Sequence, residues 1–288
     1  MSLETRQRQI NIDSSVGNLF SPQMPQTLLW PMGAVLDTIR EAHYRGVEWH
    51  PMRTWAGMQM RAGLISQDDK NAFVSLHQSY RNEKHFREAW NHPNRGIAVA
   101  SYFLLPERVS SLDNLERAQE VIGRTMPVVL YPSNEGEESG LDRPFGEKLI
   151  QPSPEVMEIW GVQTSQEFAE EAQRRGYKIC LDLLHVRRVG RMGLSLGPWQ
   201  QAFEYLLPDT SEIHVPAERS DQKQSIDTQN DFQAFLTKHG TIIEMLREIR
   251  NSGREYRVVT EMKNSYRSAQ QWVEGNRQIV EILQDQLA

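Results

Sequence analysis

The chain has 288 residues, a formal net charge of −6 and a charged fraction of 24%. Surfaces that bind nucleic acid usually carry an excess of Lys and Arg, so this balance argues against a nucleic-acid partner. The single cysteine, Cys180, excludes an internal disulfide and favours a reducing, cytoplasmic environment. No stretch approaches about 18 uninterrupted apolar residues, so we expect no membrane partner. Barrels of roughly this length form one domain, and we expect a single domain over 1–288.

A pattern of helix, glycine and short apolar strand recurs along the chain. Its first instance is a helix that ends before Gly46, a position where the left-handed backbone conformation suits glycine. The predicted helices are 33–45, 112–122, 164–176, 241–252 and 265–287. The predicted strands are 9–13, 27–30, 47–51, 96–105, 126–132, 177–185, 211–216 and 256–263. Alternating strands and helices imply parallel pairing with right-handed crossovers.

Two segments do not fit the pattern. Residues 66–92 look polar and helical, so no strand can be assigned between His50 and Gly96. Residues 133–155 are rich in Gly, Pro and charge and predict a long loop, which is either a functional lid or a surface insertion without a role. The predicted fold is therefore a (β/α)8 TIM barrel of the α/β class, with one βα unit irregular or missing.

Polar residues stand at the ends of three apolar strands. Asp182 and His185 close ICLDLLH, His214 lies in EIHVP, and Glu261 lies in RVVTEMK. A buried carboxylate is costly unless it is paired or binds a metal. One such residue is explained by an ion pair, but three strands ending this way favour a divalent metal site for Mn²⁺, Mg²⁺ or Zn²⁺. Active sites of TIM barrels lie at this end of the strands.

The segments GVEWHP, ICLDLLH, EIHVPAER and VVTEMK resemble strand signatures of the xylose isomerase-like superfamily. That family includes sugar isomerases, ketose 3-epimerases, inosose dehydratases and endonuclease IV. The resemblance implies that Asp182, His214 and Glu261 bind the metal, with Asp182 and Glu261 also catalytic. It also implies a fourth ligand, a glutamate, on the strand matching MPVVLYP. Tyr131 stands there, and a mostly protonated phenol is a poor ligand at neutral pH.

The same resemblance implies substrate contacts. His185 matches a substrate-binding histidine, and Arg219 matches an arginine that holds a hydroxyl or carboxylate. His50 is a further candidate, whereas Glu48 is expected to pack near the site without binding metal. Lys263 is either an ion-pair partner, a replacement for metal charge or an imine-forming amine. The remaining histidines fall in predicted helices or loops and are expected at the surface: His43, His77, His85, His92 and His239.

Three functions follow from these residues. The first is a metal-dependent isomerase or epimerase, or a related lyase, in which a carboxylate moves a proton beside a polarised carbonyl of a small hydroxylated substrate. The second is a barrel without a full metal site that serves as a binding or pathway-accessory protein, which Tyr131 favours. Endonuclease IV-like hydrolysis is the weakest, because no Asp-x-His pair follows His214. A homodimer is expected from the resembling families.

Overall fold

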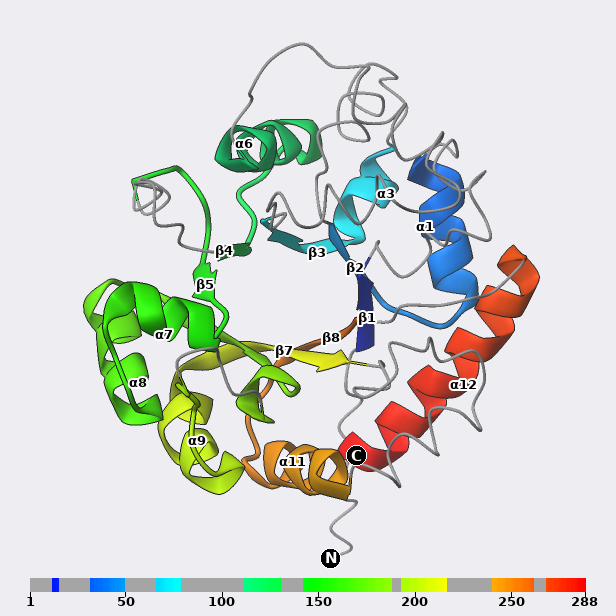
Figure 1. Ribbon diagram of the computed structural model, residues 1–288. Helices are drawn as coiled ribbons and strands as arrows, with labels where there is room; N and C mark the ends of the chain where they lie inside the picture. The colour runs from blue at the N-terminus through cyan, green and yellow to red at the C-terminus, as the bar shows by residue number, and fades with distance from the viewer. Residues whose placement is uncertain are drawn as a thin grey trace, which may run out of the picture.

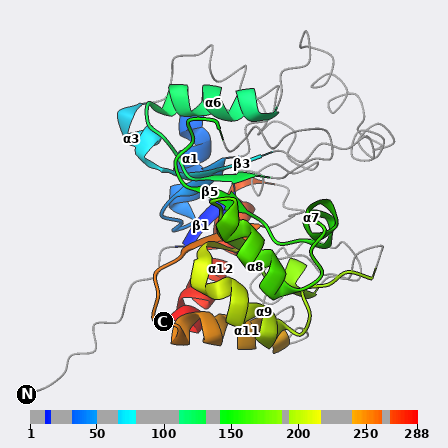
Figure 2. The same cartoon turned by 90° about the vertical axis from the view of Figure 1, so that its left-hand side faces the viewer.

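The computed structural model describes residues 12–15, 32–49, 66–78, 111–130, 142–187, 193–216, 240–261 and 268–288. Its strands form a closed, parallel, eight-stranded barrel in the order β1 to β8, with β8 pairing β1. The helices lie around the outside of the strands (Figures 1 and 2). The predicted TIM barrel is confirmed.

The strands are short, and each begins at the same end of the barrel because all pairs are parallel. Their bounds are β1 Ile12–Ser15, β2 Val47–Trp49, β3 Phe73–His77, β4 Val128–Leu130, β5 Lys148–Ile150, β6 Lys178–Asp182, β7 Thr210–Pro216 and β8 Arg257–Glu261. The α-helices are α1 Met32–Glu41, α3 Gln67–Asn71, α6 Ser111–Ile122, α7 Pro154–Trp160, α8 Ser165–Arg174, α9 Trp199–Leu206, α11 Gly240–Asn251 and α12 Ala269–Leu287. Two 3₁₀ turns are η4 His185–Arg187 and η5 Leu207–Asp209.

The prediction that 66–92 is helical was wrong for its described part. A five-residue helix, α3, is capped by Ser66 and Asp69 and leads directly into β3. Ser75 and His77 alternate with apolar residues along β3 and are buried. Polar residues at inward positions made this strand look like a polar helix, because strand patterns are recognised from their apolar side chains.

The loop predicted over 133–155 was also wrong in part, since it contains β5 and the start of α7. The strand has only three residues, too few to show a period. With β3 and β5 present, no strand of the barrel is missing. Between β4 and β5, the described residues 142–147 contain no helix.

Glycine serves two different purposes in the repeated pattern. Gly123, Gly176 and Gly253 have positive φ after their helices, as predicted. Gly46 does not, and the positive φ after α1 belongs to His43. A Cβ at Gly46 would lie 2.4 Å from Val74 Cγ1 and 2.8 Å from Asp13 Oδ1, so glycine is needed there for close packing.

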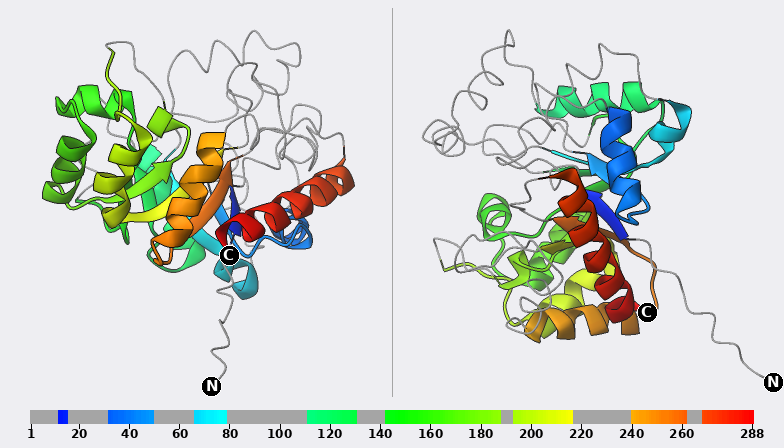
Figure 3. Two further views of the ribbon diagram at one scale, coloured as in Figure 1. Left: turned by 90° about the horizontal axis from the view of Figure 1, so that it is seen from below. Right: turned by 90° about the vertical axis from the view of Figure 1, so that its right-hand side faces the viewer.

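The first described helix, α1, and the last, α12, meet where the barrel closes. Helices α1 and α12 lie side by side (Figures 1 and 3). Tyr44, after α1, donates a 2.8 Å hydrogen bond to Asn276 of α12 and accepts a 3.1 Å hydrogen bond from Thr260 of β8. Trp272 packs against Tyr44 and is fully buried. The main apolar core fills this layer between strands and helices, where burial is the dominant stabilising term.

The inside of the barrel is different. A separate apolar cluster of only Val129, Leu149 and Cys180 lies there, and charged and polar side chains occupy other inward positions. The predicted strands 27–30 and 96–105 lie outside the described residues. No helix within the described ranges is long and apolar enough to span a membrane.

Candidate metal centre in the barrel

The inward side chains of β7 carry the centre of the candidate site. Ile213 and Val215 belong to the outer core, and their neighbours Glu212 and His214 therefore face inward, because successive strand residues point to opposite sides. Glu212 and His214 are both fully buried. The carboxylate of Glu212 and the imidazole of His214 thus lie next to each other along β7, inside the barrel.

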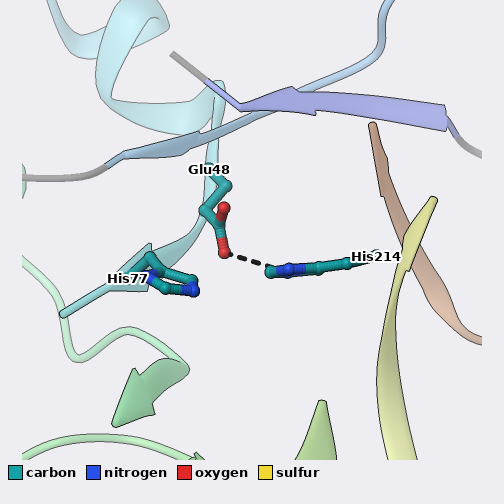
Figure 4. A group of neighbouring side chains, drawn as sticks. All are labelled: Glu48, His77 and His214. Carbon is teal, nitrogen blue, oxygen red and sulfur yellow. Dashed lines mark ion pairs between the residues drawn. The ribbon is translucent and has the colours of Figure 1, made fainter. Parts of the chain in front are cut away.

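Three strands bring potential metal ligands together at His214. Glu48 of β2, His77 of β3 and His214 of β7 each offer a ligand atom, and these atoms all lie within 4.8 Å of one another. Their side chains point toward one another (Figure 4). Glu48 Oε2 lies 3.3 Å from His214 Nε2, and the two imidazole rings are stacked with centroids 5.5 Å apart. All three residues are buried.

Two more carboxylates contact the His214 ring. Glu212 Oε1 lies 3.0 Å from Nε2, and Glu261 Oε1 lies 3.3 Å from Nδ1. Burial acts to lower the pKa of His214, but its neighbours Cys180, Glu48 and Glu261 raise that pKa well above its usual value. Burial also raises the pKa of the Cys180 thiol, so the thiol is neutral at pH 7 and the carboxylates supply the charge that His214 meets.

Glu261 is the most accessible of these carboxylates, with 30% of its side chain exposed. Burial acts to raise its pKa, but the charge of His214 and a hydrogen bond from it lower the pKa to about 2. Glu261 is therefore ionised at neutral pH. It lies at the carboxyl end of β8, where the sequence placed it.

A second group of possible ligands lies one layer deeper. Cys180, Glu212 and His214 also offer ligand atoms within 4.8 Å of one another. Glu212 is already engaged, because Arg257 Nε donates a 3.0 Å hydrogen bond to its Oε2 and Cys180 Sγ lies 3.8 Å from its Oε1. A metal there would compete with a buried ion pair, so the group of Glu48, His77 and His214 suits a metal better.

Asp182 has different neighbours from those of His214. Its Oδ1 accepts hydrogen bonds from the backbone of Leu184 at 2.7 Å and of His185 at 3.4 Å. Its Oδ2 accepts a 3.0 Å hydrogen bond from Gln151 Nε2 and lies 3.6 Å from His185 Nε2. Asp182 and Glu261 belong to neither group of possible ligands in the described residues. The structure therefore joins Asp182 to His185, and His214 to Glu261, as two neighbouring pairs.

Gln151 follows β5 and contacts Asp182. It is 1% exposed, and its Oε1 has no hydrogen-bond partner among the described residues. The fourth ligand was expected on the strand matching MPVVLYP, which contains β4. Tyr131, which stands there in the sequence, lies outside the described residues.

The remaining predicted residues divide into three sets. His185 lies in η4, with its Nδ1 buried and without a hydrogen-bond partner in the described structure. His50, Arg219 and Lys263 lie outside the described residues. The surface prediction for His77 was wrong, because β3 buries it.

Glu212 was not predicted, although its position two residues before His214 in an apolar strand was a readable signal.

Comparison with known proteins found matches among solved structures. No protein-family model matches the chain, and a search of curated proteins found no match. Among solved structures, 3-keto-D-glucoside 4-epimerase from E. coli in its apo form is 11% identical with a TM-score of 0.47, over 95% of this chain and 100% of that one. SacUVDE is 13% identical with a TM-score of 0.46, over 96% and 98%.

A xylose isomerase-like TIM barrel protein from Mycobacterium smegmatis, in complex with magnesium, is 13% identical with a TM-score of 0.36. The match covers 97% of this chain and 98% of that one. Likeness at this identity and these TM-scores carries no conclusion about the family or the chemistry of this chain.

Proposed function

We propose that the protein is a metal-dependent isomerase or epimerase, or a related lyase, that acts on a sugar, a polyol or a similar small hydroxylated metabolite. One observation carries the proposal. Two imidazoles and a carboxylate are buried together inside the barrel, with a partly exposed carboxylate, Glu261, beside them. Buried ionisable groups gathered in this way are typical of functional sites.

The donor set of Glu48, His77 and His214 fits a divalent metal. Imidazole nitrogen suits Zn²⁺, and a mixed nitrogen and carboxylate set also accepts Mn²⁺, whereas Mg²⁺ prefers oxygen ligands. A bound divalent ion would supply polarisation of a carbonyl or hydroxyl oxygen of the substrate. Of the three metals expected from the sequence, Zn²⁺ and Mn²⁺ fit these residues better than Mg²⁺.

Glu261 is the residue that we assign to proton transfer. A carboxylate with a pKa near 2 is a weak base, and His214 is the cause of that low value. Imidazoles that bind a metal are neutral, but a divalent ion held by His214 would add its own positive charge beside Glu261. Glu261 would then accept a proton from a carbon whose acidity is raised by the polarised carbonyl next to it, and return it on the same or the opposite face.

Asp182 and His185 form the second part of the site. Two backbone N–H groups and Gln151 hold the Asp182 carboxylate in one orientation, and His185 Nε2 lies 3.6 Å from it. We assign His185 to contact with a substrate hydroxyl, oriented by Asp182. Catalysis gains from such fixed geometry because less ordering is needed in the reaction itself.

The alternative, a binding or accessory protein without a metal, is favoured by two features. Tyr131 stands in the sequence where the family resemblance implies a fourth carboxylate ligand. A protonated His214 already lies between Glu48, Glu212 and Glu261, so the buried carboxylates have a cationic partner without any metal.

Hydrogen exchange at carbon separates the two functions. The protein is incubated in D₂O with Mn²⁺, Zn²⁺ or Mg²⁺ and a panel of aldoses, ketoses and inososes, and deuterium beside the carbonyl is measured by NMR. We expect metal-dependent exchange with at least one class, and its loss in Glu261→Gln. Absence of exchange with every class and every metal would support the accessory protein.

A further inference from the structure

A polar cavity lies at the amino end of the barrel, opposite to the candidate metal centre. Its volume is about 430 Å³, within the range of cavities that hold small ligands. Its walls come from the starts of β1, β3 and β8 and from the segments that enter β2 and β4. The lining residues are Asp13, Arg45, Asn71, Phe73, Val74, Arg124, Thr125, Met126, Pro127, Tyr256 and Arg257. This end of a TIM barrel usually serves stability alone.

Three guanidinium groups line the cavity, and they are engaged to different degrees. Arg257 bonds to Glu212 at 3.0 Å and to Glu147 at 2.6 Å, so its charge is balanced by carboxylates. Arg124 donates a 2.6 Å hydrogen bond to the backbone oxygen of Phe73. Neither Arg124 nor Arg45 forms a direct ion pair with a carboxylate within the described residues, although the charge of Arg45 acts on the Asp13 carboxyl in the same wall. Arg45 and Arg124 therefore have donors to offer to a ligand at the cavity wall.

Asp13 is the most deeply buried polar group of the wall. It is 3% exposed, and its Oδ1 has no hydrogen-bond partner among the described residues. Burial and the charge of Glu212 raise the pKa of Asp13 to about 7, against the opposing effects of Arg45, the Gly46 backbone and Arg257. Near neutral pH this carboxyl therefore repels an anion less than an ordinary aspartate would. A buried polar atom without a partner is costly, and a ligand hydroxyl would satisfy it.

We propose that this cavity binds a small phosphorylated molecule that also carries hydroxyl groups, with its phosphate between Arg45 and Arg124 and a hydroxyl on Asp13. Guanidinium groups pair with phosphate oxygens in a fixed geometry. The charges of Arg45 and Arg124 complement that of a phosphate monoester near neutral pH, where Asp13 carries only part of a negative charge. The volume leaves room beyond the phosphate, and Asn71 and Thr125 offer polar contacts for further hydroxyls.

The site is independent of the metal centre and of the reaction proposed for it. Its lining residues include none of Glu48, His77, His185 or Glu261. The Glu212 carboxylate touches both regions, through Arg257 on one side and His214 on the other. Ligand binding at the amino end can therefore be measured whether or not the protein has the proposed activity.

Calorimetric titration of the whole chain tests the proposal with three probes: glycerol 3-phosphate, inorganic phosphate and glycerol. We expect glycerol 3-phosphate to bind, inorganic phosphate to bind more weakly, and glycerol not to bind. Arg45→Gln should weaken binding of glycerol 3-phosphate about tenfold, the effect of losing one charged contact. Arg247→Gln is the matched control, since Arg247 is exposed on α11 and outside the cavity.

Three results would overturn the proposal. The first is the absence of any heat of binding for glycerol 3-phosphate up to a concentration of about 10 mM. A dissociation constant above that concentration is weaker than the affinity of specific ligands. The second is equal binding by Arg45→Gln and the unchanged protein. The third is an equal loss in Arg247→Gln, which would show a general effect of net charge.

A further variant, Asp13→Asn, tests the assignment of the carboxyl. The substitution removes a negative charge, so the variant should bind inorganic phosphate at least as tightly as the unchanged protein does. Weaker binding of phosphate by this variant would contradict the assignment.

Discussion

The two ends of the barrel interior have opposite character. The carboxyl end gathers Glu48, His77 and His214 within reach of a cation, whereas the amino end has a cavity lined by arginines that suits an anion. Glu212 stands between them, 3.0 Å from His214 through one oxygen and 3.0 Å from Arg257 through the other. One buried carboxylate thus balances the charge of both ends.

This difference shows how a barrel can keep a polar interior. A charge without a partner in a buried place is strongly destabilising, but a connected series of opposite charges is tolerated. Around the strands the core is apolar and continuous, so stability comes from that outer layer. The charged side chains inside the barrel can therefore differ between its two ends. Substitutions along the series of charges test whether the two ends act separately.

The largest effect is expected for His214→Ala. Loss of the imidazole leaves the carboxylates of Glu48 and Glu212 buried without their shared partner. We expect a decrease of about 3–5 kcal/mol in the free energy of unfolding, measured by urea titration in the presence of a chelator. His185→Ala, at the same end but with its side chain 20% exposed, is the control and should lose much less. Equal decreases in the free energy of unfolding would mean that the contacts of His214 with Glu48 and Glu212 do not stabilise the fold more than those of His185.

Arg257→Gln tests the amino end. The substitution leaves Glu212 buried beside Glu147 without a guanidinium. We expect a decrease of about 2–4 kcal/mol in the free energy of unfolding, since the side chain is less buried than His214. Addition of Glu212→Gln should restore part of the loss, because the uncompensated charge is then removed. Additive losses in the double variant would contradict the ion-pair account.

Gln151→Glu should lower stability at the carboxyl end without changing metal binding. A carboxylate would replace the amide that lies 3.0 Å from Asp182, and the two buried carboxylates would repel each other. We expect a decrease of about 1–3 kcal/mol in the free energy of unfolding, measured by urea titration in the presence of a chelator. The affinity for Mn²⁺ or Zn²⁺ should stay unchanged in a metal titration, because Asp182 belongs to neither group of close ligands. A large change in metal affinity would place Gln151 and Asp182 at the metal centre instead.

Asp13→Asn should change the free energy of unfolding least at low pH, and the change should grow as the pH rises. The folded-state pKa of Asp13 is about 7, raised from 3.8 chiefly by burial. The folded protein therefore keeps this proton while the unfolded chain releases it, so Asp13 lowers stability as pH increases between those values. Relative to the unchanged protein, the variant should gain up to about 4 kcal/mol between about pH 4 and about pH 8. Urea titration at both pH values checks the sign, and a gain at the acidic pH instead would refute it.

Much of the fold could be predicted from the sequence, because helices ending in glycine and apolar strands leave clear patterns. Strands β3 and β5 were not found: β3 carries Ser75 and His77 toward the polar interior, and β5 has three residues.

The candidate site was only half predictable. His214 and Glu261 stood at apolar strand ends and were found, whereas His77 was assigned to the surface and Glu48 to packing. Which inward side chains meet depends on strand register, and the pairing shifts between Val47 and Glu48 and between Ile179 and Cys180. Such shifts leave no local pattern in the sequence, so the meeting of β2, β3 and β7 at His214 needed the structure.

Metal content of the purified protein tests the central claim most directly. After loading with Zn²⁺ or Mn²⁺ and dialysis, we expect about one ion per chain by mass spectrometry, as a single site of three protein ligands implies. His77→Ala and His214→Ala should abolish this binding, and Asp182→Ala should retain it, because Asp182 belongs to neither group of close ligands. Binding that survives His77→Ala but is lost in Asp182→Ala, or no binding by the unchanged protein, would contradict the metal centre described here.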